Sequence, residues 1–474
     1  MFCYNCAKLF TPKAPNMTDI ASSAATTNAA QTADLHANIA ADSSTQKRAL
    51  SYSSTLHQLI TQIFAVKMPA DRVLADYFRA HKKHGSKDRR VIRESLFGIF
   101  RWWGWYQQFE QPLAQSQSWF AILAFTAKFE QHNWTEIADA WAKFAHMEAL
   151  SNQAELTDIA AKCQRLNEHN PQLKLAVNDL LPDWFWQHIE PLSTEQTEQL
   201  LQAMSTRPPI WARVQGISVT KACQVLVEQG IEATPSPYFA DAINLGHKSI
   251  NLNGLSLYKN GQLEIQDLGS QVIGQICAPK ANEHWWDACS GAGGKTLQLR
   301  SLMLAQDPKS QGSIVASDIR HKPLEELHKR AKRAKYNHIT TARWRSDALP
   351  INADDIDHVL VDAPCSCTGT WRRNPDMRWL DDESAITDKP ELQLDILTRS
   401  SHAVKAGSYL VYATCSLASA ENQQVVNAFL AAHPQFELLS VSHPFTQTPA
   451  EMLTVQPYQA DSDGMFVAKM IKRR

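Results

Sequence analysis

Trp285-Trp-Asp-Ala-Cys-Ser-Gly-Ala-Gly-Gly-Lys-Thr296 is the stretch of this 474-residue chain that decides its fold. It has the pattern of a buried strand, a glycine-rich loop and the first turn of a helix. Glycines allow a backbone to approach a ligand, and the amide groups at the start of the following helix attract negative charge. Strands and helices alternate from here to the end, which predicts a doubly wound α/β domain with a mostly parallel sheet.

The strands of this domain are expected at regular intervals. Their predicted residues are 285–288, 312–317, 339–344, 356–362, 407–413 and 465–471, the last strand being antiparallel. Ligands of such sheets bind outside the carboxyl ends of the strands, near the point where the strand order reverses. The functional residues are therefore expected at these ends.

Two familiar nucleotide-binding motifs do not fit the glycine loop. Gly294-Lys-Thr296 ends like the phosphate loop of nucleoside triphosphatases, but that motif needs a glycine five residues before Gly294, where this chain has Cys289. A dinucleotide fingerprint also fails, because no third glycine follows Gly291-x-Gly293 at the required spacing. The loop is therefore expected to bind a different ligand.

Acidic residues recur at the ends of successive strands. Asp318 ends the second strand, where a carboxylate can bind both hydroxyls of a ribose; Asp347 follows the third, where it could face an adenine edge, and Asp362 ends the fourth. One such acid is more often a helix cap, but their ordered recurrence predicts a pocket for an adenosine-bearing ligand such as S-adenosylmethionine. The expected cofactor-binding residues are Cys289, Ser290, Gly291, Ala292, Gly293, Gly294, Lys295, Asp318, Asp347 and Asp362.

Two cysteines stand at the ends of strand-like runs: Val359-Leu-Val-Asp-Ala-Pro-Cys365-Ser-Cys367 and Tyr409-Leu-Val-Tyr-Ala-Thr-Cys415. A thiol in this place suits covalent chemistry better than core packing. Beside an S-adenosylmethionine pocket, such thiols indicate methylation of carbon 5 of a pyrimidine, because a thiolate added to carbon 6 makes carbon 5 nucleophilic. Asp362 can offset charge by sharing a proton with cytosine nitrogen 3. From the residues alone, either Cys365 or Cys415 can attack, and Cys367 is expected to fill a turn.

Basic residues gather locally although the formal net charge is -1. Such patches neutralise phosphates, and neighbouring aromatic rings can stack on bases, so they suit RNA. The alternative is a solvated helix face with core tryptophans, which is equally compatible with the first two patches. The patches are Arg79–Arg101 with Trp102, Trp103 and Trp105, then His328–Lys335, and Trp371–Trp379.

Composition divides the chain into four segments. Residues 1–49 are rich in Ala, Ser and Thr and are expected to be disordered, with Met17 as an alternative start. Residues 50–205 predict an all-α domain, residues 206–280 a small α/β subdomain and residues 281–474 the catalytic domain.

No apolar run is long enough to span a membrane, and the amino terminus lacks the pattern of a secretory signal. The nine cysteines have the scattered spacing of reduced thiols, which favours the cytoplasm. Cys3 and Cys6 form one CxxC pair without a second ligand pair, so no metal site is expected.

The motifs DAPCSCTG and ATCS, preceded by DACSGAGGKT, resemble the Nop/Sun family of RNA 5-methylcytosine methyltransferases, and most closely its RsmB-like members. The resemblance covers residues 208–474 and implies a class I, Rossmann-like methyltransferase domain with S-adenosylmethionine as cofactor. It implies that Cys415 is the nucleophile and that Cys365 assists product release. The helical segment more faintly resembles a NusB-like RNA-binding domain. The implied partner is RNA, specifically small-subunit ribosomal RNA, bound by a cytoplasmic monomer.

One departure from the family pattern concerns the glycine loop. The usual Cys-Ala-Ala-Pro-Gly-Gly-Lys is replaced by Cys289-Ser-Gly-Ala-Gly-Gly-Lys295, which removes the fixed φ of proline. Binding of the cofactor is expected to persist but to be weaker. The alternatives are a tRNA methyltransferase, a DNA cytosine methyltransferase, in which Cys365 would attack, and a non-catalytic RNA-binding or ribosome-assembly factor.

Overall fold

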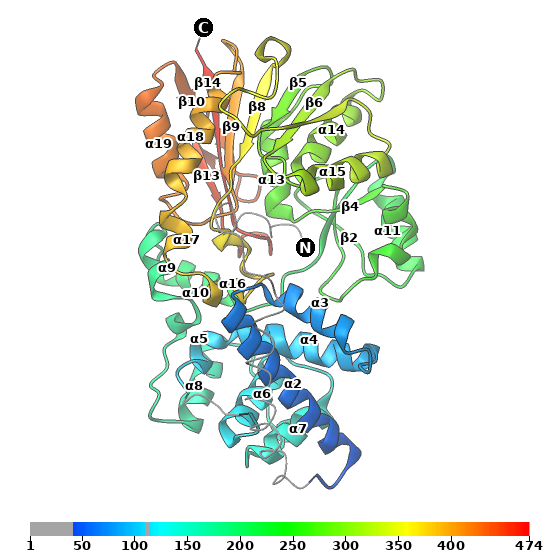
Figure 1. The fold of residues 1–474 in the computed structure, drawn as a ribbon, viewed down its shortest axis with the longest axis vertical. Helices are drawn as coiled ribbons and strands as arrows, with labels where there is room; N and C mark the ends of the chain where they lie inside the picture. The colour runs from blue at the N-terminus through cyan, green and yellow to red at the C-terminus, as the bar shows by residue number, and fades with distance from the viewer. Residues whose placement is uncertain (1–40, 110–113, 474) are drawn as a thin grey trace, which may run out of the picture. The chain divides into compact units, whose positions relative to one another are not determined.

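The computed structural model describes residues 41–109 and 114–473, which divide into two compact units. One unit holds residues 184–373 together with the chain from Glu383 onward (Figure 1). The other ends at Asp183 and takes in the separate segment Asn374–Asp382. Met17 and the Cys3/Cys6 pair lie outside the described residues. None of the described helices combines the length and the apolar character needed to cross a membrane.

The larger unit is built on an eight-stranded sheet in the order β10-β14-β9-β8-β5-β6-β7, with β13 paired to β14. Strands β5 to β9 are parallel, and β14 joins β9 antiparallel, as expected for the last strand. The sheet confirms the predicted Rossmann-like fold. Its strands are β5 (His284–Asp287), β6 (Ser313–Asp318), β7 (Ile339–Arg343), β8 (His358–Asp362), β9 (Tyr409–Thr414), β10 (Phe436–Leu438), β13 (Met452–Val455) and β14 (Met465–Lys472).

Helices cover both faces of this sheet because its strands are apolar on both sides. Trp285 packs with residues of α13 and α14 in one core cluster, whereas the next residue, Trp286, packs with residues of α18 and α19 in another. This alternation follows from the two-residue period of a strand. The helices are α13 (Leu268–Cys277), α14 (Gly294–Gln306), α15 (His321–Arg333), α18 (Pro390–Ser401) and α19 (Gln423–Ala432).

A separate antiparallel sheet precedes the main one, in the order β2-β3-β1-β4. Helix α11 (Val219–Glu228) packs on it through Ala222 and Leu226, as its apolar spacing predicts. The strands are β1 (Trp211–Val214), β2 (Thr234–Pro235), β3 (Ala242–Asn244) and β4 (Leu263–Ile265). The preceding helices of the same unit are α9 (Asp183–His188), which starts at its boundary, and α10 (Thr194–Met204).

The smaller unit is helical around a core rich in aromatic side chains. Helix α2 begins at Ser44, capped by the Ser43 hydroxyl, so the expectation of disorder to residue 49 is wrong for its last residues. The segment Asn374–Asp382 belongs to this unit: the Asp376 carboxylate accepts a bond from Ala70 N, and Trp379 Nε1 donates to Phe100 O. The helices are α2 (Ser44–Val66), α3 (Ala70–Ala80), α4 (Ser86–Arg101), α5 (Trp103–Tyr106), α6 (Gln117–Phe129), α7 (Thr135–Phe144), α8 (Ile159–His169) and α16 (Met377–Leu380).

Burial separates the structural members of the basic patches from the exposed ones. Trp102 and Trp105 are almost fully buried, so they belong to the helical core and are not available to stack on bases. Arg372 and Arg378 are also buried, which excludes a surface role for these two members of the third patch. Arg330 of the second patch is buried against Glu264. Sequence spacing cannot reveal this, because a buried arginine differs from an exposed one only in what folds over it.

Gly369 lies where three segments of the larger unit meet. Its N–H donates to Cys415 O at 2.9 Å, and its carbonyl accepts from Gly464 N at 2.8 Å. A Cβ on Gly369 would lie 2.1 Å from Gly464 O, a backbone atom that cannot move aside alone.

We therefore expect Gly369→Ala to lower the free energy of unfolding by about 1–3 kcal/mol, as overpacking does. Gly254→Ala is the matched control, because the nearest atom to its added Cβ is a side-chain nitrogen at 3.4 Å. Thermal unfolding of both variants tests this, and equal midpoints would contradict it.

Candidate active site

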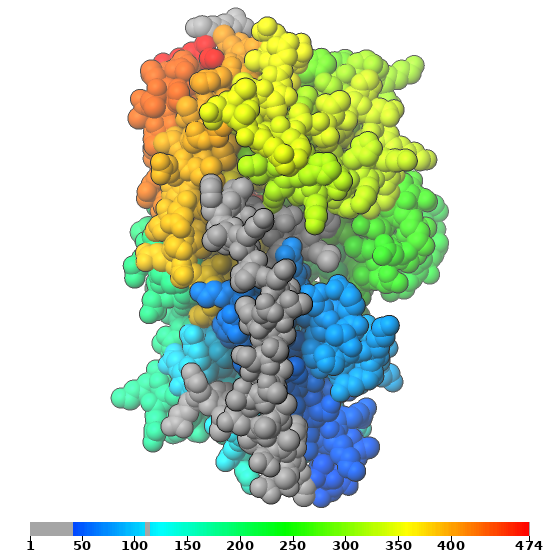
Figure 2. Space-filling view, viewed as in Figure 1, coloured from blue at the N-terminus to red at the C-terminus, as the bar shows by residue number. Residues whose placement is uncertain are grey.

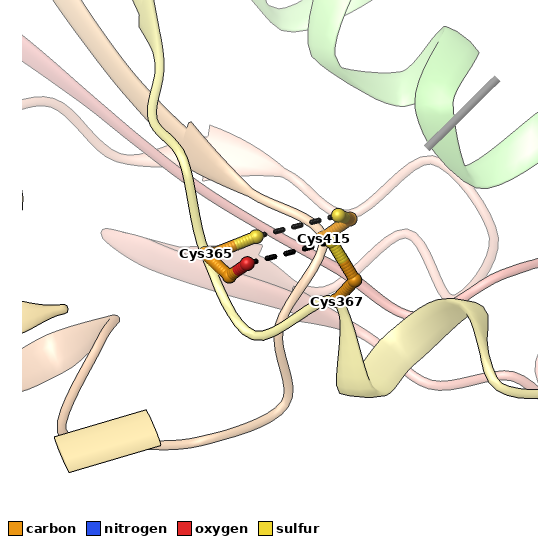
Figure 3. Close-up of side chains that lie close together, drawn as sticks. All are labelled: Cys365, Cys367 and Cys415. Atoms are coloured by element: carbon orange, nitrogen blue, oxygen red, sulfur yellow. Dashed lines mark hydrogen bonds between the residues drawn. The ribbon is translucent and has the colours of Figure 1, made fainter. Parts of the chain in front are cut away.

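The two cysteine motifs meet at one edge of the main sheet. Cys365 follows β8 and Cys415 follows β9, and these strands pair in parallel, so their carboxyl ends lie side by side. The two Sγ atoms are 3.3 Å apart (Figure 3). Both side chains are nearly enclosed, Cys365 being 2% exposed and Cys415 7%. The sequence-predicted pair is therefore a single site with two adjacent thiols.

Cys367 occupies a turn, as expected, but its side chain also joins this pair. Its backbone is left-handed, with φ 61°, and Thr370 N donates to its carbonyl at 2.9 Å. Its Sγ lies within 4.8 Å of both other sulfurs. None of the cysteines in the described ranges forms a disulfide.

Glu421 connects the loops that carry the two cysteines. Its Oε1 accepts from Ser366 N at 2.8 Å and from Gln393 Nε2 at 3.1 Å. Its Oε2 accepts from the hydroxyls of Ser366 and Ser416, both at 2.5 Å. The carboxyl therefore binds the residue after Cys365 and the residue after Cys415 at the same time.

Glu421 is a functional candidate that the sequence did not single out. It lies just before α19, whose N-cap is Asn422. The available signal was an acid six residues after Cys415, but nothing in the spacing tells a buried carboxyl from an exposed helix cap. Burial raises the pKa of Glu421 to about 8.

Asp362 and Lys295 link the cysteine loop to the glycine loop. Lys295, in the first turn of α14, places Nζ 2.7 Å from Asp362 Oδ2 at the end of β8. Both side chains are partly exposed. An ammonium group thus balances the carboxylate three residues before Cys365.

The glycine loop leads from β5 to α14 and packs against the end of β6. Ser290 N donates to Ser317 O at 2.8 Å, and Gly291 N donates to Asp318 Oδ2 at 3.2 Å. Gly293 has φ 83°, and a Cβ there would collide with Leu327 of α15, so this position requires glycine. Arg330 Nη1 donates to Ala292 O at 2.6 Å, which supports the loop from below where the family has a proline.

These residues fit an adenosine-bearing cofactor. An added Cβ at Gly291 or Gly294 would meet nothing within 4 Å, so space is open above the loop. Asp318 is at the expected strand end, where Arg320 now pairs with its carboxylate at 2.7 Å. The loop from Cys289 to Lys295, Asp318 and Asp362 lie around the carboxyl ends of neighbouring strands. Asp347 lies in the loop after β7, where its carboxylate is exposed and 3.7 Å from Arg399.

Asp287 is a second buried acid that the sequence analysis did not assign. It ends β5, and Thr296 Oγ1 donates to its Oδ2 at 2.6 Å. Within the described chain its Oδ1 has no hydrogen-bond partner. Burial raises the pKa of Asp287 to about 7.

Glu421 gives a pH-dependent prediction. A carboxyl with a higher pKa in the folded than in the unfolded chain contributes stability that is complete below its ordinary pKa of 4.5 and is lost as the pH rises through about 8. We expect the wild-type chain to lose stability relative to Glu421→Gln over this window, because an amide keeps the hydrogen bonds without a charge.

Glu421→Ala is the contrasting variant. It leaves Ser366 N and the serine hydroxyls without their partner, so we expect a loss of about 1–3 kcal/mol near pH 5, where the wild-type carboxyl is protonated, and a smaller loss relative to wild type as the pH rises. Urea unfolding of the three proteins between pH 5 and about 8.5 measures both effects. A Gln variant with the pH dependence of wild type would contradict the assignment.

Comparison with known proteins places the chain in a family. The family described as "16S rRNA methyltransferase RsmB/F" matches residues 274–471, and a "Methyltr_RsmF/B-like, ferredoxin-like domain" matches residues 181–250. "Ribosomal RNA small subunit methyltransferase B" of Yersinia pestis bv. Antiqua (strain Angola) is 30% identical over 408 residues, which cover 83% of this chain and 92% of the relative. The protein of the same name from Yersinia pseudotuberculosis serotype O:1b (strain IP 31758) is 29% identical over the same shares.

Two solved structures share the fold. The crystal structure of PH0851 superposes with a TM-score of 0.67 at 21% identity, covering 90% of this chain and 99% of that one. NSun6 from Pyrococcus horikoshii with SFG gives a TM-score of 0.52 at 17% identity, covering 62% of this chain and 97% of that one. Membership of a methyltransferase family supports S-adenosylmethionine as the cofactor. The matched domains and the identity over most of both chains show that this protein belongs to the RsmB/F family of rRNA methyltransferases.

Proposed function

We propose that this protein is an RNA cytosine-5 methyltransferase that acts on small-subunit ribosomal RNA. One observation carries the proposal: two nearly enclosed thiols lie 3.3 Å apart at the ends of adjacent parallel strands, in a chain of the rRNA methyltransferase family. S-adenosylmethionine, when bound, supplies the methyl group. We propose that the loop from Cys289 to Lys295, with Asp318, Asp347 and Asp362, holds this cofactor.

In the proposed reaction the Cys415 thiolate adds to carbon 6 of cytosine, and carbon 5 becomes nucleophilic and accepts the methyl group. Carbon 5 then loses its proton and the carbon–sulfur bond to Cys415 breaks, which restores the aromatic base. Cys365 lies next to the breaking bond and assists release by accepting the proton from carbon 5 as a general base. Asp362 supports the adduct by sharing a proton with nitrogen 3.

The surroundings of Cys415 suit a fixed nucleophile. Asn422 Nδ2 donates to Ser416 O at 2.9 Å, and Thr414 Oγ1 donates to Asn422 Oδ1 at 2.5 Å. The residues on both sides of Cys415 are thus tied to the cap of α19. Such support keeps the thiol in position for attack.

The assignment of Cys415 as the attacking thiol and Cys365 as the releasing thiol is the point most open to test. We expect RNA containing 5-azacytidine to trap a covalent adduct with the wild-type chain and with Cys365→Ala, and none with Cys415→Ala. Denaturing gel electrophoresis separates the adduct from free protein. The reverse pattern would make Cys365 the attacker, as in DNA cytosine methyltransferases.

The alternative that is not an enzyme is a non-catalytic RNA-binding or ribosome-assembly factor. Titration calorimetry with S-adenosylmethionine distinguishes it, because a vestigial pocket would not bind the cofactor. Bisulfite sequencing of total RNA from a deletion strain would then identify the methylated nucleotide and separate rRNA from tRNA.

We further propose that the helical segment supplies RNA affinity through α3, α4 and the loop between them, which lie on the face shown in Figure 2. This surface carries basic side chains that remain exposed after the tryptophans are buried. They are Arg79, Lys82, Lys83, Lys87, Arg90 and Arg93. The segment boundaries at residues 205 and 280, the monomeric state and the cytoplasmic location stay predictions.

The basic surface predicts a salt effect. Each phosphate contact adds roughly 0.7–0.9 to the slope of log affinity against log salt, so Lys82→Ala/Lys83→Ala should weaken RNA binding and flatten that slope. Lys143→Ala/Lys174→Ala is the matched control on exposed lysines of the same unit. Filter binding at several salt concentrations measures both variants, and an unchanged slope in the first would mark the surface as merely solvated.

A further inference from the structure

Three thiols, not two, converge at the strand edge. The Sγ atoms of Cys365, Cys367 and Cys415 all lie within 4.8 Å of one another, and Cys365 and Cys415 are 3.3 Å apart. Figure 3 shows the three side chains directed toward a common region from the two cysteine loops. The proposed methylation uses Cys365 and Cys415 and gives Cys367 no task.

If Cys367 served only to fill its turn, another residue type would suit the backbone of that turn better. A left-handed backbone such as its φ of 61° is adopted most readily by glycine or asparagine. Thr370 fixes the turn by donating to Cys367 O from both N and Oγ1 at 2.9 Å. The thiol of Cys367 is therefore held beside the other two by a rigid turn.

The spacing of the sulfurs suits a tetrahedral metal ion. Zinc–sulfur bonds of ~2.3 Å at a tetrahedral angle place two sulfurs about 3.8 Å apart. The sulfurs of Cys365 and Cys415 are 3.3 Å apart, and that of Cys367 lies at most 4.8 Å from each of them, so the cluster has about the required size. Small side-chain rotations therefore bring all three sulfurs into coordination distance, without movement of the strands.

We propose that Cys365, Cys367 and Cys415 form a binding site for a thiophilic divalent cation, zinc, with three thiolate ligands and a fourth position open. Each thiol that binds the ion releases a proton. Cys367 is the more exposed member of the cluster and gives the ion its route in, since Cys365 and Cys415 are nearly enclosed.

The consequence for catalysis rests on the proposed function, whereas binding itself does not. Coordination to zinc draws electron density from the sulfur and holds it in the cluster, so a bound thiolate adds to carbon 6 of cytosine less readily. Bound zinc would therefore suppress the methyltransferase reversibly, since a chelator returns the thiols.

Cobalt(II) is the spectroscopic probe for this site, because its colour reports tetrahedral geometry and its ultraviolet charge-transfer band reports bound thiolates. The full chain carries a second cysteine pair, Cys3 and Cys6, so the titration uses a Cys3→Ser/Cys6→Ser background under anaerobic, reducing conditions. We expect one equivalent of cobalt to bind with tetrahedral absorption, and zinc to displace it.

Cys367→Ala in the same background is the decisive variant. Loss of a direct ligand should weaken cobalt binding by at least the roughly 10–100-fold that loss of an outer hydrogen-bonding partner costs, and should reduce the charge-transfer band. Cys223→Ala is the matched control, a partly exposed cysteine of the small antiparallel subdomain, and should leave the titration unchanged. Circular dichroism verifies that both variants fold.

Identical titrations for Cys367→Ala and its background, or the absence of a thiolate charge-transfer band, would overturn the proposal. A second measurement tests the effect of zinc on catalysis. Zinc should reduce the amount of 5-azacytidine adduct. With each protein compared to its own metal-free level, Cys367→Ala should need more zinc than its background for the same fractional loss of adduct. Cobalt binding needs neither RNA nor S-adenosylmethionine. A chain that binds cobalt but forms no adduct would therefore refute the proposed function and leave the metal site standing.

Discussion

The parallel pairing of β8 with β9 is the constraint on which the site depends. It brings to one edge two loops that are 50 residues apart in sequence, and it sets Cys365 beside Cys415. Strand pairing alone fixes only where the loops begin. Glu421 fixes how they continue, because one carboxyl binds the residue that follows each cysteine. The closeness of the thiols thus results from a ladder of backbone bonds completed by one buried side chain.

Burial governs the chemistry of the acids around this edge. Glu421 and Asp287 are enclosed, and desolvation raises the pKa of each into the neutral range or above it. Asp362 is instead partly exposed and paired with Lys295. Glu421 and Asp287 therefore support the site through hydrogen bonds. Asp362, at the edge of the sheet, is the acid that we propose contacts the cytosine base. The same type of residue therefore has different tasks according to its solvent access.

Six of the eight strands of the main sheet were predicted within a few residues, because apolar runs bounded by glycine and charged residues are a local property. The short strands β10 and β13 were not predicted. The cysteine motifs and the glycine loop were found for the same reason. The role of the first two basic patches was left open, and Trp102 and Trp105 are core residues, as one of the alternatives expected. The burial of Arg330, Arg372 and Arg378 was not predicted. Asp347 lies exposed in the loop after β7, and its contact with the cofactor stays a prediction. Charge and aromaticity are visible in a sequence, but the side that faces solvent depends on packing partners far along the chain.

The sequence by itself determined the fold class, the glycine loop and the pair of cysteines, because each is encoded by residue types at short spacing. Only the tertiary structure decided which groups meet. It joined Glu421 to both cysteine loops, placed Arg330 under the glycine loop and brought Cys367 within reach of the other two thiols. These contacts depend on the order and register of the strands. Strand order is a property of the whole sheet that no local pattern carries.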